Sequence, residues 1–533
     1  MRYWRSILAH GALATALTVG AAGAASAQTV LHRGNSGEPA TLDPHFASGT
    51  WENDIIGDMF LGLLTEAADG EAIPGAAESW EISDDGTVYT FDLREDGVWS
   101  DGEPVTAGDF VYSLRRILTP ETAAEYAFLL YPIANAEAIN SGEIEDVSQL
   151  GVRAIDDATL EITLEEPTPY FLEQLTHYTS FPVPQHVIEE HGDEWTDGGT
   201  MVTNGAYTLV EWLPQTHVHV EKNDNFYDAE NVSIDEVYYY PTEDRSAALR
   251  RFRAGELDLN TDFPSEQIDF IEENLADSYR INPYLGIYYY PINANDPALS
   301  DVRVREALNL ALNREAITDQ VLGTGEVPAY SFVPPLPNAY EAAEFDFKDT
   351  SYDERLEEAR ALMEEAGYGP DNPLAFTLRY NTSENHRRVA VAAAAMWKEI
   401  YVEADLFNTD VAVHYDDLQE NDFQVARAGW IADFPDAINF LELFSDNNYN
   451  YGRWMNEDFN ALLAESATIQ DEAERFATLQ QAEAMVLEDY ATIPIYYYVS
   501  KALVGPHVEN WVDNPKFINR TRWLSIDESE RPG

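Results

Sequence analysis

The segment that decides the fold is VARAGWIADF, residues 425–434. It has the pattern of a short apolar strand that ends in a turn at Pro435, with Arg427 near its start and Asp433 near its end. Such a strand can leave the N–H and C=O groups of one edge free for a partner. With two opposite charges beside it, the segment predicts a groove for an extended, zwitterionic ligand such as a short peptide. A structural ion pair between the two charges is the alternative that the segment alone leaves open.

The first 27 residues have the pattern of a secretory signal peptide. Arg2 and Arg5 precede an apolar run that ends in Ala25-Ser26-Ala27, so the mature chain is expected to begin near Gln28. No later stretch reaches the roughly 20 apolar residues of a membrane-spanning helix. The chain has no cysteine, which excludes disulfides, thiol catalysis and a lipid-modified cysteine. We therefore expect a soluble periplasmic protein without a lipid anchor.

The composition is strongly acidic. The chain has 96 acidic and 31 basic residues, a formal net charge of −65, and its acids are spread along the whole sequence. This predicts a hydrated acidic surface suited to high salt and excludes nucleic acid and anionic lipid as partners. Near molar salt the Debye length is about 3 Å, so ligand capture there depends on direct contacts. Lysine occurs at only five positions, Lys222, Lys348, Lys398, Lys501 and Lys516.

Hydrophobic periodicity predicts a mixed α/β chain. Thr106 is expected to cap a helix, with Asp109 completing a capping box. Alternating and aromatic-rich runs predict strands at 30–33, 87–94, 159–164, 238–240, 288–290 and 496–498. Amphipathic spacing predicts helices at 54–64, 302–322, 386–401 and 471–487, and one that Ser351 caps and that ends before Gly367.

Several stretches carry a resemblance to a known family. They are residues 38–44 (EPATLDP), 77–113, the Asn204-Gly205 turn and residues 426–433 (ARAGWIAD). On them the chain resembles the oligopeptide-binding proteins of bacterial ABC importers, the family 5 extracellular solute-binding proteins. The resemblance implies an α/β, two-lobe periplasmic-binding-protein-like fold with an extra subdomain in the first lobe and a ligand cleft between the lobes. The implied boundaries are 1–27 for the signal peptide, 28–61 with 186–286 and 501–533 for the first lobe (domain I), 62–185 for the inserted subdomain (domain II) and 287–500 for the second lobe (domain III).

The resemblance also implies a set of ligand-binding residues. Asp433 would bind the α-ammonium group of a peptide, and the carboxylate end would meet Arg427 or His386, of which His386 is charged only when protonated. The peptide backbone would pair with the second lobe on one side and with a loop of the first lobe on the other. The backbone and cleft positions implied are Gly429, Trp430, Ile431, Ser48, Gly49, Thr50, Tyr126, Tyr284, Gly286 and Tyr289.

The sequence departs from the pattern of close relatives at four of its positions. Ser48 stands where an acidic residue is common, and Pro291 stands where a glutamate is found. Leu418 and Leu322 take the places of two cations. The preferred peptide length is therefore the property that the resemblance transfers least.

Enzyme and metal motifs give no positive signal. The chain lacks a G-x-S-x-G elbow, and none of its lysines lies in a Walker A context. The spacing of His186 and His191 fits neither common zinc motif, and the pair His217 and His219 would need further ligands. We predict no enzyme activity, no metal and no cofactor.

The predicted function is the solute-binding component of an ABC importer. It would act as a monomer, hold short peptides in an extended conformation by β-augmentation and deliver them to a membrane permease. Three alternatives in the same fold remain open, namely murein peptides, oligosaccharides and nickel chelates. A secreted hydrolase is the alternative of another class.

Overall fold

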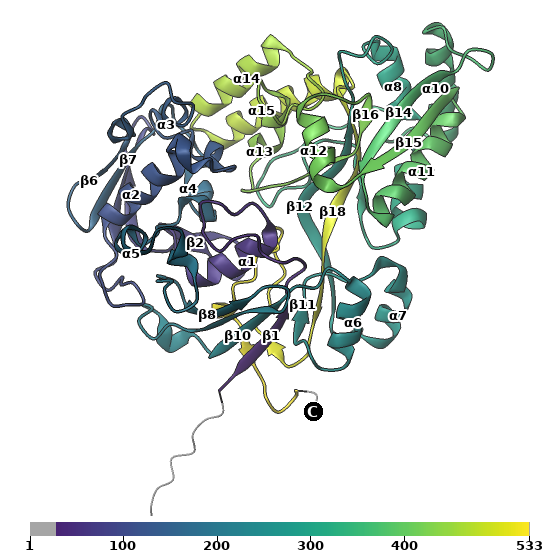
Figure 1. Ribbon diagram of the computed structural model, residues 1–533. Helices are drawn as coiled ribbons and strands as arrows, with labels where there is room; N and C mark the ends of the chain where they lie inside the picture. Colours follow the sequence, from purple (N-terminus) through teal and green to yellow (C-terminus); the bar gives the residue numbers. More distant parts are fainter. Residues whose placement is uncertain (1–27, 532–533) are drawn as a thin grey trace, which may run out of the picture.

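The computed structural model describes residues 28–531, and the predicted signal peptide lies outside them. Two lobes are connected by a pair of long antiparallel strands, β12 (Tyr279–Pro291) and β18 (Thr492–Val504), which run through the centre of the molecule (Figure 1). Two of the predicted tyrosine strands therefore become neighbours, because Tyr288 pairs with Tyr496 in this register. The pair of strands carries one large sheet from the first lobe into the second.

This sheet has nine strands, and eight of them follow the order β17-β12-β18-β11-β1-β10-β9-β8. The first-lobe strand β1 is parallel to β10 and β11, whereas the other pairings are antiparallel. The ninth strand, β13, joins β18 from the side. The remaining bounds are β1 (Val30–Gly34), β8 (Tyr207–Leu213), β9 (His217–Lys222), β10 (Glu236–Tyr240), β11 (Leu259–Asn260), β13 (Val327–Pro328) and β17 (Ala428–Ile431).

The inserted part of the first lobe is built on a four-stranded antiparallel sheet in the order β4-β5-β7-β6. The predicted capping box is confirmed, since the Asp109 carboxylate accepts a 2.8 Å hydrogen bond from the Thr106 backbone N–H at the start of α2. Trp99 and Phe110 are fully buried in the core of this lobe. The elements are β4 (Ala77–Ile82), β5 (Val88–Leu93), α2 (Ala107–Leu118), α3 (Ala136–Asn140), β6 (Val152–Ala154), β7 (Thr159–Thr163), α4 (Phe171–Gln174) and α5 (Gln185–His191).

The predicted helix at 54–64 is displaced. The structure has α1 at Thr50–Met59, after which the chain becomes extended at Phe60 and enters β2 (Leu64–Glu66), which pairs with β3 (Ala72–Pro74). Helices α6 (Arg245–Arg253) and α7 (Ile268–Asn274) form a small core beside the long strands, and β19 (Val508–Glu509) pairs with β20 (Ser525–Ile526).

The second lobe contains a three-stranded parallel sheet in the order β15-β14-β16, covered by helices (Figure 1). The predicted helix at 302–322 is interrupted, because the Asn313 side chain accepts a hydrogen bond from the Ala316 N–H and starts a new helix. It becomes α8 (Val302–Leu310), α9 (Arg314–Ala316) and a π-helical turn (Ile317–Leu322). Ser351 caps its helix as predicted. The other elements are α10 (Tyr352–Glu365), β14 (Leu374–Asn381), α11 (Glu384–Lys398), β15 (Val402–Thr409), α12 (Val411–Gln419), β16 (Val425–Ala426), α13 (Ile438–Leu441), α14 (Glu457–Thr468) and α15 (Glu472–Glu488).

The two lobes touch at the rim of the space between them. The rings of Tyr170 and Phe434 are stacked at 5.0 Å between centroids, and Phe128 lies 5.3 Å from Tyr449. Leu129 of the inserted subdomain packs into a core cluster of the second lobe. The lobes are therefore in a closed arrangement. Across residues 28–531, every helix is too short or too polar to cross a membrane.

Candidate functional site

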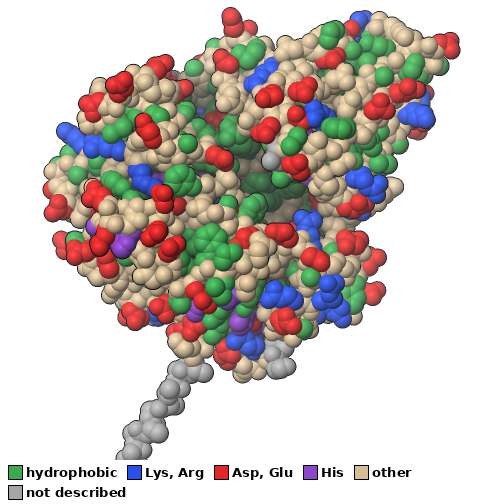
Figure 2. All heavy atoms as spheres, viewed as in Figure 1, with side chains coloured by type: hydrophobic (Ala, Val, Ile, Leu, Met, Phe, Trp, Pro, Cys, Tyr) green, Lys and Arg blue, Asp and Glu red, His purple; other side chains and the backbone are tan. Residues whose placement is uncertain are grey.

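A cavity of about 380 Å³ lies between the lobes and is lined by residues of both. Figure 2 shows the hollow at the centre of the molecule, with acidic side chains scattered over the surrounding surface. Eight of the thirteen predicted ligand residues line this cavity, namely Ser48, Gly49, Thr50, Tyr126, Tyr284, His386, Ile431 and Asp433. The other five are not part of the lining, namely Gly286, Tyr289, Arg427, Gly429 and Trp430.

The segment 425–434 does not form one strand. Its first part, β16, belongs to the three-stranded sheet, and after Arg427 its second part, β17, joins the nine-stranded sheet beside β12. Gly286 of β12 lies opposite Ile431, and a Cβ there would meet the end of the Ile431 side chain at 2.5 Å and the Tyr498 ring at 3.0 Å, so a larger residue would force these side chains to shift. Because β17 is the outermost strand of its sheet, one of its edges has unpaired N–H and C=O groups, as predicted.

Asp433 follows this free edge and lines the cavity. Burial raises the pKa of its carboxyl group to about 7. Its contacts are with Asn439, whose amide Oδ1 accepts hydrogen bonds from the Asp433 N–H at 3.1 Å and from Trp430 Nε1 at 3.0 Å. Within residues 28–531, Asp433 forms no ion pair with a cationic side chain. A desolvated carboxylate without a cation is stabilised by any ligand that brings one.

A second acid lies behind Asp433. The Asn439 Nδ2 group is 3.3 Å from Glu442 Oε1 and 3.5 Å from Asp433 Oδ2, so one amide contacts both carboxyl groups. Burial and the neighbouring charge of Asp433 raise the pKa of Glu442 to about 8. Burial therefore disfavours a negative charge on either acid, and a cation at this end of the cavity would stabilise their ionised forms.

Arg427 occupies a different position from the one expected of a carboxylate-binding side chain. It is 7% exposed and lies behind the lining, where Nη2 donates to the Tyr498 hydroxyl at 2.6 Å and Nη1 to the Tyr415 hydroxyl at 3.1 Å. The ion-pair alternative is also wrong for the described residues, since none of their carboxylates lies within ion-pairing distance of it. Tyr498 is the residue of this group that lines the cavity.

His386 lines the cavity near the start of α11, but burial and the neighbouring charge of Arg427 lower its pKa to about 2. Without a ligand its imidazole is therefore neutral at physiological pH. Its Nδ1 atom is buried without a hydrogen-bond partner in the described structure. It can act as a hydrogen-bonding group.

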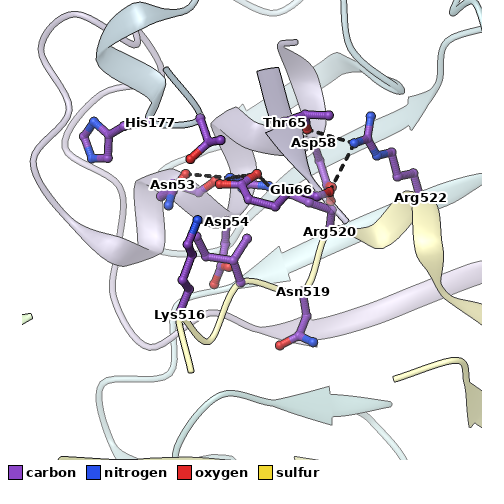
Figure 3. A network of polar contacts seen from close by, with 12 residues as sticks. Asn53, Asp54, Asp58, Thr65, Glu66, His177, Lys516, Asn519, Arg520 and Arg522 are labelled. Atoms are coloured by element: carbon purple, nitrogen blue, oxygen red, sulfur yellow. Dashed lines mark hydrogen bonds and ion pairs between the residues drawn. The ribbon is translucent and has the colours of Figure 1, made fainter. Parts of the chain in front are cut away.

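The loop Ser48-Gly49-Thr50 lies on the first-lobe wall at the start of α1. Arg520, from the C-terminal segment, fixes α1 by donating to the Asn53 carbonyl oxygen at 2.6 Å and pairing with Glu66 at 3.2 Å, both side chains being almost fully buried. Figure 3 shows this network together with Lys516. The C-terminal segment thus holds the cavity wall in place.

Aromatic residues complete the wall near Asp433. Tyr126 lines the cavity and stacks on His177 at 5.7 Å, while Tyr284 meets Phe517 edge to face at 6.0 Å. Tyr289, by contrast, points into a core of the second lobe, 5.0 Å from the ring of Phe332.

Sequence reasoning missed most of the charged lining. Arg245, Asp262, Glu326, Lys501 and Lys516 all face the cavity. The scarcity of lysine was the available signal, because two of the five lysines of the chain line this one cavity. The two histidines weighed as metal ligands contact separate acids, His217 with Glu211 and His219 with Glu236.

The two lobes, the crossing strands and the enclosed cavity define a periplasmic-binding-type protein. The chain belongs to the bacterial extracellular solute-binding proteins, family 5, whose middle region matches residues 71–452. It is 40% identical over 528 residues, 97% of each chain, to the periplasmic oligopeptide-binding protein OppA of Escherichia coli K12. It is 39% identical, over 92% of each chain, to the probable deoxycholate-binding periplasmic protein YgiS of the same organism.

A solved structure agrees with this assignment. Haemophilus influenzae OppA in complex with RPPGFSPFR superposes with a TM-score of 0.83 at 35% identity, covering 94% of this chain and 99% of that one. The resemblance predicted from the sequence is confirmed at the level of the family and the fold.

Proposed function

We propose that this chain is the peptide-binding component of an ABC importer, which encloses short, extended peptides between its lobes and delivers them to a membrane permease. The observation that carries the proposal is Asp433, a buried carboxylate in the cavity that lacks a cationic partner among the described residues. The α-ammonium group of a peptide supplies the missing cation.

Two backbone surfaces support an extended cargo. The free edge of β17 offers N–H and C=O groups on the second-lobe side, and the loop at Gly49 does so on the first-lobe side. An extended peptide buried without such partners would lose about 1–3 kcal/mol for each unpaired backbone group. Pairing through the main chain binds peptides of many sequences, which suits an importer.

Closure around the cargo uses the contacts at the rim. The ring pairs of Tyr170 with Phe434 and of Phe128 with Tyr449 join the lobes. We assign domain I to 28–61, 186–286 and 501–533, domain II to 62–185, and domain III to 287–500. In this proposal the protein is a periplasmic monomer exported by its signal peptide, and it performs no catalysis.

The test is calorimetric titration in molar salt with alanine peptides of two to five residues, each with a free or an N-acetylated amino terminus. We expect the free amine to bind at least tenfold more tightly, and Asp433→Asn to remove this difference. Asp446→Asn, at an exposed position beyond α13, is the matched control.

A second set of experiments distinguishes peptides from other possible ligands. Deoxycholate is titrated under the same conditions, and the protein purified from its own host in high salt is examined by native mass spectrometry. Co-purified masses that resolve into sums of amino acids support peptides. Tight deoxycholate binding without peptide binding, or co-purified sugars or metal chelates, would overturn the proposal.

A further inference from the structure

The charged residues of the cavity away from Asp433 form a second cluster. Arg245 at the start of α6, Asp262 after β11, Glu326 before β13 and Lys501 in β18 all line the cavity. Burial raises the pKa of Asp262, and the charges of Arg245 and Lys501 both oppose that effect, so the two cations lie near the same carboxylate. The negative charge of Asp433 instead helps to raise the pKa of three tyrosines, Tyr126, Tyr178 and Tyr284.

We propose that Arg245 and Lys501 bind the terminal carboxylate of the cargo, so that the cavity recognises a short peptide by both of its charged ends. This inference rests on the proposed function, because it takes the cargo to be a peptide whose amino end lies at Asp433. It replaces Arg427 and His386, the two residues expected from the resemblance, with two residues that face the cavity as cations.

In this cluster the groups that still lack a hydrogen-bond partner are donors. Arg245 contacts Asp262 Oδ2 through Nε at 2.6 Å, and its two terminal amino groups have no acceptor within the described part of the chain. The other oxygen of Asp262 already accepts from the Phe263 N–H at 2.7 Å. A guanidinium with free terminal N–H groups can bind a carboxylate through two parallel hydrogen bonds.

The ammonium group of Lys501 also keeps a free hydrogen-bond donor. Its ammonium group donates to Thr324 Oγ1 at 2.9 Å and to Glu326 Oε1 at 2.7 Å, which leaves one N–H free. Both oxygens of Glu326 are already used, since Oε2 contacts the Thr324 hydroxyl at 2.7 Å. The acids of the cluster are thus satisfied while the two cations retain donors, and these donors can bind a carboxylate that the ligand brings.

The amino end of α11 adds to this preference. Ser383, Asn385 and His386 line the cavity, and the Ser383 side chain makes no capping hydrogen bond, so backbone N–H groups of the first turn are available. The neutral His386 ring can donate or accept, and a helix amino terminus favours negative charge. These groups supplement Arg245 and Lys501 and do not replace their charge.

The distance between Asp433 and Lys501 suits a short peptide. Ala432 donates to the Leu285 carbonyl oxygen, which places Asp433 near Tyr284 of β12, whereas Lys501 pairs with Ile281. Three residues separate these positions, roughly 10 Å along the strand direction. An extended chain of a few residues covers such a distance.

The experiment compares alanine peptides of two to five residues as free acids and as C-terminal amides, by calorimetric titration in molar salt. We expect the wild-type protein to bind the best free acid at least tenfold more tightly than its amide. Arg245→Gln and the double variant Lys501→Gln with Glu326→Gln should each reduce this ratio several-fold while leaving amide binding unchanged. The double variant removes both charges of the Lys501–Glu326 ion pair, so Glu326 is not left as a buried charge without its partner.

Arg250→Gln, at an exposed position of the same helix, is the matched control and should leave the ratio unchanged. A ratio near one in the wild type, or a ratio insensitive to both cavity variants, would overturn the inference. Full affinity for peptide amides that end in glutamate would also overturn it, because the site would then bind a side-chain carboxylate and not the terminal one. Failure to bind either form would instead contradict the proposed function, so the two failures are distinguishable.

Discussion

Arg427 donates a 2.6 Å hydrogen bond from Nη2 to the hydroxyl oxygen of Tyr498, and of these two residues the tyrosine lines the cavity. The guanidinium also lies 5.0 Å from the ring of Tyr288. A buried cation is therefore held by neutral oxygens and an aromatic face. Its described surroundings make it a support for the cavity wall.

Tyr498→Phe tests this support. Removal of the hydroxyl leaves a terminal amino group of Arg427 buried without its acceptor, which should lower the free energy of unfolding by about 1–3 kcal/mol. Urea unfolding in molar salt measures the change. Tyr288→Phe is the matched control, because the Tyr288 hydroxyl is buried without a partner and its loss should cost much less. Equal losses in the two variants would contradict a supporting role for the hydrogen bond.

A substitution at Gly429 tests the same hydrogen bond between Arg427 and Tyr498. A Cβ at this position would lie 2.8 Å from the Tyr498 hydroxyl and 2.9 Å from Arg427 Nη2, so Gly429→Ala must displace one of them. We expect a loss of about 1–3 kcal/mol in unfolding free energy, typical of overpacking, and weaker peptide binding.

The control for that variant is Gly369→Ala. A Cβ at Gly369 meets nothing within 4 Å, so the change should leave unfolding and binding nearly unaffected. If Gly429→Ala unfolded at the same urea concentration as Gly369→Ala, the packing around Tyr498 would be looser than the structure shows.

Capture of a peptide ammonium at Asp433 should release a proton. In the empty cavity the pKa of Asp433 is raised to about 7 by burial, so at pH 6 the carboxyl group is mostly protonated. The cation stabilises the ionised form and lowers this pKa, so the proton leaves as the ligand enters. Binding should therefore weaken as the pH falls below 7, approaching about tenfold per pH unit.

Calorimetry in buffers of different ionisation enthalpy measures the number of protons released when the peptide binds. The groups facing Asp433 are Asn439, Glu442 and a set of tyrosines, so Asp433 is the group whose ionisation a cation favours first. We expect close to one proton released at pH 6 in the wild type and none in Asp433→Asn. Proton uptake, or release that persists in the variant, would place the titration on another group.

The sequence predicted the family and the fold, because these depend on local motifs. Asp433 and Gly49 lie in or beside short stretches that carry the resemblance, and their role in binding stays a prediction. For the carboxylate end the resemblance implied Arg427 or His386, and this assignment stays a prediction; His386 lines the cavity, whereas Arg427 does not. Arg427 turns behind β17 because the chain changes sheets at that residue, and His386 loses its charge through burial. Neither effect is visible in a linear pattern.

Arg245, Glu326 and Lys501 escaped prediction for a related reason. They come from helix, loop and strand positions far apart in the sequence, and only the closed lobes bring them to one cavity. In a chain with 96 acids, individual carboxylates carry no signal, whereas the rare lysines do.

A buried ion pair supports the wall that carries Gly49. Arg520 and Glu66 are 3% and 2% exposed, and Arg520 also binds the Asn53 carbonyl oxygen within α1. Arg520→Leu leaves the Glu66 carboxylate buried without its partner, so we expect a loss of about 3–5 kcal/mol in unfolding free energy. Adding Glu66→Gln removes the stranded charge and should recover part of that loss. A double-mutant cycle by urea unfolding measures the coupling, and strictly additive losses would show that the pair contributes little to holding α1 and its loop against the cavity.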